Sequence, residues 1–327
     1  MENKIRWGIV GLGRIAHKFV KDLALVHDAE IRAVASRDLE NAHLFSLAYG
    51  IPLAFGSYRE LLECGEVDVV YIATPHTHHA KIAIMAMESG KHVLCEKPMA
   101  INTAQVESMI AVARKNNVFL MEALWSRFNP SIQKIKSLID RNEIGPIVYL
   151  HADFAFYALD RDPDGRVLNP KLAGGSLLDI GIYPIFLAYL LLGRPQKILS
   201  TSNFHINGAE IQTSIIFQYP SSHALLYSGF TGRSEVAAQI SGEKGSIYIP
   251  GRWHEAQGYR LEKEGEVGEF DLPTTGRGYF YEIEEVHRCI RQGKLESDLW
   301  GHQNSLDLID LMDTVRKQNG IDFPFLE

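Results

Sequence analysis

The first third of the chain alternates short apolar runs with longer amphipathic stretches. The apolar runs are rich in β-branched residues and have the length of buried strands, whereas the stretches between them have the spacing of helices. Strands are expected at IRWGIV, EIRAVAS, VDVVYIA, HVLCE and VFLMEA, and helices at about 14–26, 39–49, 79–89 and 103–115. Because strands alternate with helices, crossover connections are required, and the pattern predicts a parallel sheet.

The rhythm changes after Ile147, where six β-rich runs follow one another with a single helical interruption at about 176–192. The runs are IVYLHADFAF, ILSTSNFHI, AEIQTSIIFQY, HALLYSGF, EVAAQISG and GSIYIP. Such succession favours an antiparallel sheet. We therefore predict an α/β protein with a parallel-sheet domain over 1–123 and a second α/β domain over 124–327 with a large, open, mainly antiparallel sheet. Two helices, at about 279–292 and 303–317, end the chain, and the last can pack back on the first domain.

Composition narrows the classes of partner. The chain has 327 residues, 46% of them apolar, and a net charge of -7 without a basic stripe, which argues against nucleic acid and anionic membranes as partners. The longest apolar run, 182–192, is too short to span a membrane, and the amino terminus lacks a signal-peptide pattern. We expect a cytoplasmic protein whose three cysteines are reduced thiols.

A glycine motif, VGLGRIA, stands at the end of the first predicted strand and the start of a helix. Gly11 permits a tight turn, Gly13 lets the backbone approach a pyrophosphate, and the small Ala16 allows close packing of the helix. The alternative is a turn with a purely structural role. The strand and helix around the motif favour a dinucleotide site that includes Gly11, Gly13, Arg14 and Ile15.

The end of the second predicted strand bears on the choice of cofactor. An acidic residue there would bind the ribose hydroxyl of NAD, but the sequence has Ser36 and Arg37. A hydroxyl and a guanidinium can bind a 2'-phosphate, which favours NADP over NAD. Two alternatives stay open: Arg37 is a solvated surface charge, or Asp38 binds the ribose.

Three histidines follow the next strand, in the segment IATPHTHHAKIA. Histidine clusters bind metals, but no cysteine or carboxylate lies at ligand spacing here, so we predict no metal site. The segment is expected to line the cofactor cleft, with Thr74, Pro75 and His79 as cofactor contacts.

The segment HVLCEKP carries a charged pair to the carboxyl end of a strand, where ligands bind in open parallel sheets. Lys97 is therefore expected to face the cleft, and Glu96 is suited to hold it. Pro98 restricts the backbone before it and can form a cis bond.

In LAGGSLLDIGIYPIF, Asp179 and Tyr183 are four residues apart, hence on one face of the predicted helix. The sequence leaves two interpretations open at this point. The two residues are part of a site, or the helix is an ordinary amphipathic one in which Asp179 meets an arginine and Tyr183 a carbonyl.

Taken together, the glycine motif, Glu96-Lys97-Pro98 and GGSLLDIGIYPI (174–185) resemble the Gfo/Idh/MocA oxidoreductase family. EALWSRFNP (122–130) is most similar to its branch of dihydrodiol dehydrogenases and NADP-dependent D-xylose dehydrogenases. The resemblance implies a Rossmann domain, a second domain whose sheet makes a homodimer or higher oligomer, and an enzyme.

The resemblance also implies roles for single residues. Lys97 and Tyr183 would form the acid/base pair, although many relatives have histidine in place of the tyrosine, and Asp179 would bind substrate. Trp125 and Arg127 would lie near the nicotinamide.

Two more residues have open assignments. His76 is assigned as a substrate contact, but the chain departs from the family here, since asparagine is frequent at this position. Arg166 is part of a loop over the pocket or a surface charge.

The predicted reaction transfers hydride between NADP and a secondary alcohol or hemiacetal of an aldose, polyol or trans-diol. The sequence has no cluster of arginines of the kind that would bind a phosphorylated substrate, so uncharged sugars and diols are favoured. The alternative is a non-catalytic NADP-binding redox sensor, which would need the glycine turn and Arg37 but no proton carrier such as Lys97.

Overall fold

The computed structural model describes residues 4–323 and divides into two compact units. The first contains the chain up to Trp125 together with Thr275–Leu306. The second contains Ser126–Thr274 and the chain from Asp307 on. Each unit has its own sheet, its own core and its own candidate site residues.

The first unit is built on a six-stranded sheet in the order β3-β2-β1-β4-β5-β6, with all neighbours parallel. This confirms the predicted parallel sheet, whose order reverses between β1 and β4. The unpredicted β3 is too short to show a pattern. The strands are β1 (Ile5–Val10), β2 (Ala29–Ala35), β3 (Leu53–Phe55), β4 (Val69–Ile72), β5 (His92–Glu96) and β6 (Leu120–Ala123).

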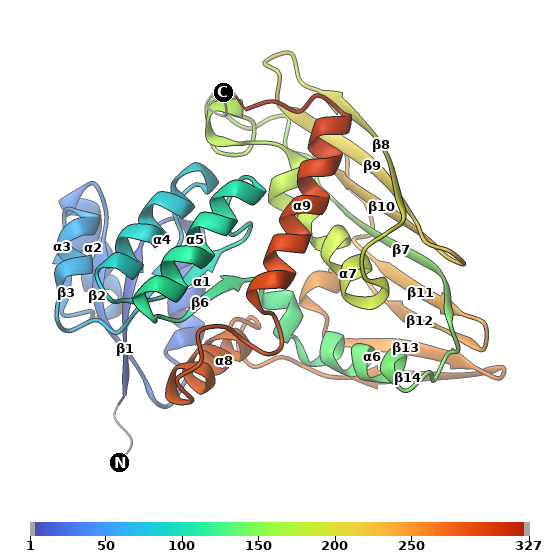
Figure 1. Cartoon of the computed structure of the whole chain (residues 1–327), viewed down its shortest axis with the longest axis horizontal. Coiled ribbons are helices and arrows are strands. Elements are labelled where there is room, and N and C mark those ends of the chain that lie inside the picture. Colours follow the sequence, from blue (N-terminus) through green and yellow to red (C-terminus); the bar gives the residue numbers. More distant parts are fainter. Residues whose placement is uncertain (1–3, 324–327) are drawn as a thin grey trace. The chain divides into compact units, whose positions relative to one another are not determined.

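Two helices of the first unit begin at side chains that bond their first backbone N–H groups. Asp38 caps α2 by accepting the Glu40 N–H, and Asn102 caps α5 by accepting the Gln105 N–H at 2.9 Å. Figure 1 shows α4 and α5 side by side. The helices are α1 (Arg14–Leu23), α2 (Leu39–Tyr49), α3 (Tyr58–Glu63), α4 (His79–Glu88), α5 (Thr103–Asn116) and α8 (Phe280–Arg291).

Aromatic residues fill the core between the sheet and α8. Phe19 stacks on Tyr71 with ring centroids 3.6 Å apart, and the fully buried Trp7 donates its indole N–H to His287 at 2.9 Å. The other ring nitrogen of His287 bonds Asp28 at 2.9 Å. Helix α8 is thus fixed to the sheet by polar contacts as well as by packing.

The second unit contains an eight-stranded sheet in the order β14-β13-β12-β11-β7-β10-β9-β8. Every pair is antiparallel except β7 with β10, which confirms the mainly antiparallel prediction. The strands are β7 (Ile147–Ala155), β8 (Lys197–Phe204), β9 (Glu210–Gln218), β10 (His223–Gly229), β11 (Ala238–Gly242), β12 (Gly245–Ile249), β13 (Gly258–Lys263) and β14 (Glu266–Asp271).

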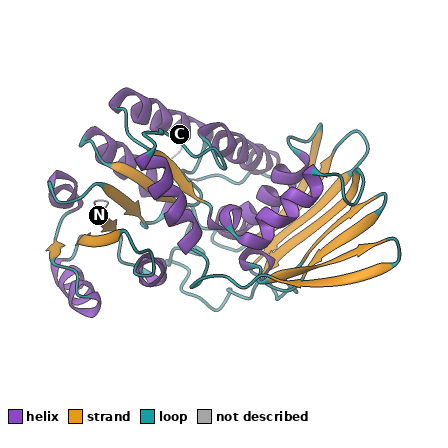
Figure 2. Ribbon diagram, turned by 90° about the horizontal axis from the view of Figure 1, so that it is seen from below, coloured by secondary structure: helices purple, strands orange, loops and turns teal. Residues whose placement is uncertain are grey.

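Helices cover one face of this sheet (Figure 2). They are α6 (Pro130–Asp140), α7 (Ile182–Leu192) and the later part of α9 (His302–Gln318), whose first turns belong to the first unit. On the uncovered face Leu199, Ile216 and Leu225 are each more than a third exposed. Among the described residues, no helix combines the length and apolarity needed to cross a membrane.

The helix expected at about 176–192 is present, but its first part is not α-helical. Leu177–Gly181 form a π-helical turn, and α7 begins only at Ile182. Pro184 has no N–H to bond the carbonyl four residues earlier, and the wider turn accommodates this loss. Asp179 and Tyr183 therefore lie on two different segments.

Candidate cofactor and substrate sites

The turn after β1 has the geometry of a dinucleotide site. Gly11 has φ +89°, and a Cβ there would lie 2.7 Å from the carbonyl carbon of Ala73. A side chain is therefore excluded by the strand next to it, and this is the point where the strand order reverses. The turn brings the start of α1 to the carboxyl edge of the sheet.

The start of α1 leaves room for a ligand. Gly13 is its N-cap, no side chain caps the helix, and a Cβ on Gly13 would meet nothing within 4 Å. Beside this turn, the hydroxyl oxygens of Thr74 and Thr77 are buried and bond no described residue. Open amides and orphaned hydroxyls at one edge fit a polar, anionic group such as a dinucleotide pyrophosphate. Arg14 is exposed and Ile15 half-buried.

The residues after β2 bear on which side chain contacts the cofactor ribose. Asp38 uses its carboxylate to cap α2, accepting the Glu40 N–H at 3.0 Å, and the Ser36 hydroxyl accepts the Asp38 N–H at 3.2 Å. Arg37 is exposed; burial lowers the pKa of His78, and the nearby charge of Arg37 lowers it further. This position therefore presents an exposed guanidinium next to a carboxylate that caps α2.

The histidine segment is part of the same edge. His79 is fully buried, and its ring nitrogens lie 2.9 Å from the Pro98 carbonyl oxygen and 2.8 Å from the Thr74 carbonyl oxygen. Burial, together with the nearby charge of Lys97, lowers the pKa of His79 to about 4. His76 is 5% exposed and packs edge-on against His79. His79 thus joins the segment after β4, including the half-buried Pro75, to the turn after β5. The described residues form no cluster that could hold a metal.

The turn after β5 carries Lys97 at this edge, half-buried, and the Lys97–Pro98 bond is cis. Glu96 is buried, and its carboxylate accepts the Tyr71 hydroxyl and the Lys97 backbone N–H, the latter at 3.2 Å. Glu282 on α8 is a fully buried carboxyl whose pKa burial raises most, and Glu96 lies close enough for its charge to raise that pKa further.

Sequence reasoning missed Glu122, at the end of β6. It is 3% exposed and opposite Cys95 in the strand register. Its carboxylate accepts bonds from the Met99 backbone, Ser305 and Trp300. A charged residue in the apolar run VFLMEA was the only signal that could have identified it.

The segment between the units carries the next two predicted residues. Trp125 is buried in the first unit and stacks on Tyr279, with ring centroids 4.7 Å apart. Arg127 is buried in the second unit, where the neighbouring Ser126 donates its hydroxyl to the His254 carbonyl at 2.5 Å.

In the second unit, the π-helical turn presents Asp179 to Arg166. The guanidinium donates two hydrogen bonds to the carboxylate, at 2.9 and 3.4 Å. Asp179 is 13% exposed at its side chain and Arg166 39%. Two of the three predicted substrate residues are thus partners, and the pair keeps a face toward solvent.

Tyr183 lies in an aromatic environment of the second unit. Its ring is 5% exposed, with centroids 5.6 Å from Phe154 and 5.2 Å from His254. Phe154 and His254 stack on each other at 4.3 Å. His254 was not predicted, since a single histidine in GRWHE has no distinguishing pattern.

A buried carboxylate also fixes the π-helical turn. Glu210 is 1% exposed and accepts the Leu177 N–H and the Ser176 and Thr213 hydroxyls, each at 2.7 Å. A Cβ on Gly175, which has φ +142°, would lie 3.1 Å from the Glu210 carbonyl oxygen. Glu210 therefore holds the segment that carries Asp179.

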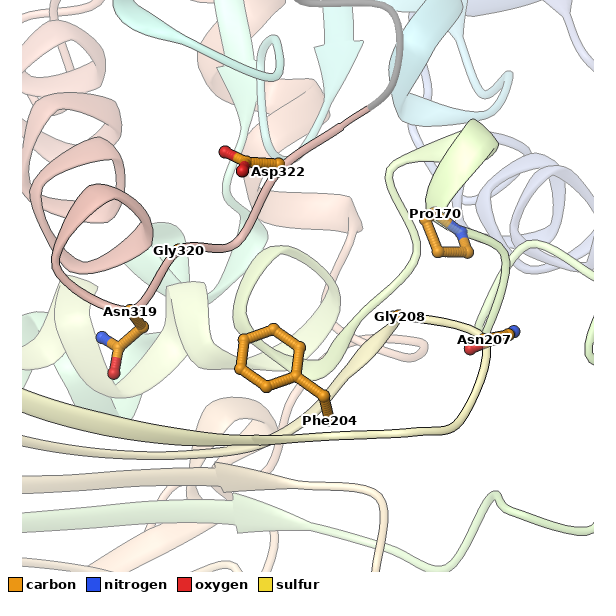
Figure 3. Close-up of a pocket in the computed structure, with 7 residues that line it drawn as sticks. All are labelled: Pro170, Phe204, Asn207, Gly208, Asn319, Gly320 and Asp322. Carbon is orange, nitrogen blue, oxygen red and sulfur yellow. The ribbon is translucent and has the colours of Figure 1, made fainter.

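The second unit also has a pocket of about 420 Å³ away from these residues (Figure 3). None of the predicted site residues lines it. The lining residues are Pro170, Phe204, Asn207, Gly208, Asn319, Gly320 and Asp322.

Comparison with known families agrees with this geometry. Residues 5–124 match the model of an oxidoreductase family with an NAD-binding Rossmann fold, and residues 132–248 match the GFO/IDH/MocA C-terminal domain. The chain belongs to the GFO/IDH/MocA oxidoreductase family. As a member of this family it is an NAD(P)-dependent oxidoreductase.

Curated relatives extend the match over the whole chain. The trans-1,2-dihydrobenzene-1,2-diol dehydrogenases of Xenopus tropicalis and Homo sapiens are 36% and 34% identical to it, covering 98% of this chain and 99% and 98% of their own. The similarity to these dehydrogenases indicates a reaction at CH–OH groups.

Two solved structures share the fold at 26% identity, each covering 96% of this chain and 97% of its own. One is a 3-ketoreductase from Actinomadura kijaniata in complex with NADP, with a TM-score of 0.84. The other is an aldose-aldose oxidoreductase from Caulobacter crescentus complexed with glycerol, with a TM-score of 0.88.

Proposed function

We propose that this protein transfers hydride between NADP and a secondary alcohol or hemiacetal of an aldose, polyol or trans-diol, with Lys97 and Tyr183 as the acid/base pair. The observation that carries the proposal is the position of Lys97. Its turn follows β5 at the edge that also holds the Gly11 turn, and Glu96, His79 and Glu122 bond its backbone. A redox sensor needs no lysine fixed in this way.

The choice of NADP rests on the residues after β2. Asp38 is engaged in capping α2, whereas Arg37 offers an exposed positive charge next to the Ser36 hydroxyl. A guanidinium binds phosphate through charge-assisted hydrogen bonds, whereas a carboxylate at this position would repel the 2'-phosphate of NADP. The complexes of the Actinomadura relative with NADP support the same choice.

In this mechanism the bound nicotinamide supplies the hydride-accepting carbon, and the protein manages one proton. Tyr183 exchanges the proton with the substrate hydroxyl, and the Lys97 ammonium favours the phenolate form of that tyrosine. Solved variants of the Actinomadura ketoreductase replace a lysine or a tyrosine, the same two residue types.

Substrate selection is assigned to the second unit. The Asp179 carboxylate accepts hydrogen bonds, and Arg166 fixes its orientation through two of them. Phe154, His254 and Tyr183 supply ring faces on which an alicyclic ring can lie. His76, in the first unit, is the remaining proposed substrate contact, whereas Trp125 and Arg127 are proposed to lie near the nicotinamide. Diol and sugar relatives agree with a small, uncharged, hydroxylated substrate.

We propose a homodimer through the uncovered face of the large sheet. Leu199, Ile216 and Leu225 line a groove of about 470 Å³ on this face, together with residues of β7 to β10. Exposed apolar patches of this kind mark interaction surfaces. Light scattering of the parent protein and of Leu225→Asp tests this proposal. The parent should be dimeric and the variant monomeric. A monomeric parent would contradict the proposal.

The central test is a substrate panel of aldoses, polyols and diols, run with NADP and NAD in parallel and followed by nicotinamide absorbance. Turnover should be seen with NADP, and Lys97→Met should lower kcat at least about 100-fold while the NADPH Kd changes only a few-fold. NADPH binding without turnover of any compound would favour the redox sensor. Unchanged turnover in Lys97→Met would remove the lysine from the mechanism.

A further inference from the structure

Glu122 is a buried carboxylate whose hydrogen bonds all come from fixed or buried donors. Its Oε1 accepts the Met99 backbone N–H at 2.9 Å. Its Oε2 accepts the Ser305 hydroxyl at 2.7 Å and the Trp300 indole N–H at 3.1 Å. A backbone N–H and an indole N–H cannot become acceptors, so both oxygens face fixed donors, although the Trp300 N–H also lies 3.1 Å from Ser305 Oγ.

The Met99 N–H belongs to the turn that carries Lys97. Pro98, between the two, has its carbonyl oxygen 2.9 Å from His79 Nδ1. The Pro98 carbonyl and the Met99 N–H belong to one peptide group, so this peptide plane is held at both ends, by His79 at its oxygen and by Glu122 at its N–H. With the backbone fixed at residues 98 and 99, the lysine side chain starts from a defined position.

Glu122 also lies within electrostatic range of the Lys97 ammonium. Burial raises the pKa of Glu122, while Ser305, Trp300, Met99 and Lys97 favour its charged form. The charge of the lysine thus stabilises the carboxylate that holds its own turn. Met99 and Cys95 are buried beside Glu122, and the Cys95 sulfur lies 3.6 Å from the Met99 carbonyl oxygen. Water therefore has little access to the carboxylate.

We propose that Glu122, supported by Ser305, is a positioning residue that fixes the Lys97 turn for proton exchange. The inference rests on the proposed catalytic role of Lys97. Because Ser305 lies on α9, 183 residues away in sequence, the start of that helix becomes part of the lysine's support. Glu122 itself touches no reacting atom.

The test compares Glu122→Gln and Ser305→Ala with Glu285→Gln as a matched control. Glu285 is likewise buried in the first unit and accepts a serine hydroxyl, from Ser297, but bonds no residue of the lysine turn. Glutamine at 122 keeps the shape but must turn its amide N–H2 toward one of the fixed donors.

We expect Glu122→Gln to lower kcat about 10- to 100-fold and Ser305→Ala about 3- to 10-fold, the range of one or two lost hydrogen bonds. The NADPH Kd should stay within about three-fold in both. Glu285→Gln should lower Tm yet leave kcat within about two-fold. If Glu122→Gln does not fold, Ser305→Ala carries the test.

A double-mutant cycle with Lys97→Met separates positioning from general damage. If Glu122 acts through the lysine, Lys97→Met/Glu122→Gln should be no more than about two-fold slower than Lys97→Met alone. A loss that persists in the Lys97→Met background, or an equal loss in Glu285→Gln, overturns the inference. If Lys97→Met is itself fully active, the proposed function fails; if it is slow while Glu122→Gln is fully active, only the inference fails.

Discussion

Glu282 gives the sharpest test of the electrostatics in the first unit. Its carboxyl group is fully buried on α8, and neither oxygen has a hydrogen-bond partner among the described residues. Burial raises the pKa of Glu282 well above its usual range, and the carboxylates of Glu96 and Asp22 raise it further. The folded protein therefore favours the protonated form of this carboxyl group.

The perturbation is Glu282→Gln, which keeps the shape and polarity of the protonated acid. Each pH unit above the ordinary carboxyl pKa of about 4.3 costs about 1.4 kcal/mol when the folded state keeps the proton. At pH 7 the parent therefore carries a penalty of up to about 4 kcal/mol that the variant lacks. The cost of burying an unpaired polar group is common to both and cancels.

The pH dependence has a definite sign. Because the folded pKa of Glu282 is raised, its destabilising effect is absent near pH 4 and grows as the pH rises through the unfolded value toward the folded one. Calorimetric Tm values of parent and variant should agree near pH 4 and separate by about 5 °C or more near pH 7, with the variant higher.

Glu285→Gln is the matched control with the opposite sign. Arg288, Ser297 and Cys289 hold the pKa of Glu285 below its usual value despite its burial. Its removal should destabilise the protein at pH 7, and the difference should shrink as the pH falls. If Glu282→Gln is less stable than the parent at pH 7, or if its advantage does not change between pH 4 and 7, the assignment of a protonated Glu282 is wrong.

Three further predictions concern the two sites. Gly11→Ala should lower both Tm and NADPH affinity because its Cβ meets the Ala73 backbone, whereas Gly13→Ala should keep Tm and lose about 10-fold or more in NADPH affinity, as measured by fluorescence titration. Arg37→Ala should weaken NADPH binding about 10- to 100-fold and NADH binding no more than about three-fold, and equal losses would contradict a phosphate contact. Glu210→Gln should cost about 1–3 kcal/mol in urea unfolding at pH 7, since the Leu177 N–H then lacks a charged acceptor, and an unchanged midpoint would refute that role.

Much of the fold followed from local pattern. The parallel sheet and most strands of the second sheet were predictable because apolar runs, glycine turns and helix spacing are encoded within a few residues. Helix α6 was missed although Asn129 caps it and Pro130 follows at its first position, an ordinary start signal. The hairpin of β13 and β14 was missed because its residues are largely charged and exposed.

The same distinction between local pattern and distant contacts decided which site residues could be predicted. Gly11 and Lys97 could be assigned because they follow strands within recognisable motifs. Glu122, Glu210 and His254 could not, because each acquires its meaning from partners distant in sequence, such as Ser305 for Glu122. Pro184 is a local signal for the π-helical turn, but the carboxylate that holds the start of this turn, Glu210, lies 33 residues from the Leu177 amide that it binds and could not be predicted.

The two units use the same physical device on the segments proposed to carry the reaction. In the first, Glu122 accepts the N–H of Met99, two residues after Lys97; in the second, Glu210 accepts the N–H of Leu177, two residues before Asp179. A carboxylate offers only acceptors, so neither turn can flip its amide without losing a charge-assisted bond inside a dry core. Burying such a carboxylate costs stability, as the raised pKa values of both residues indicate. A fold that needed only packing would reach the same turns with apolar side chains, whereas placing a proton carrier to within a fraction of an ångström requires a bond with direction.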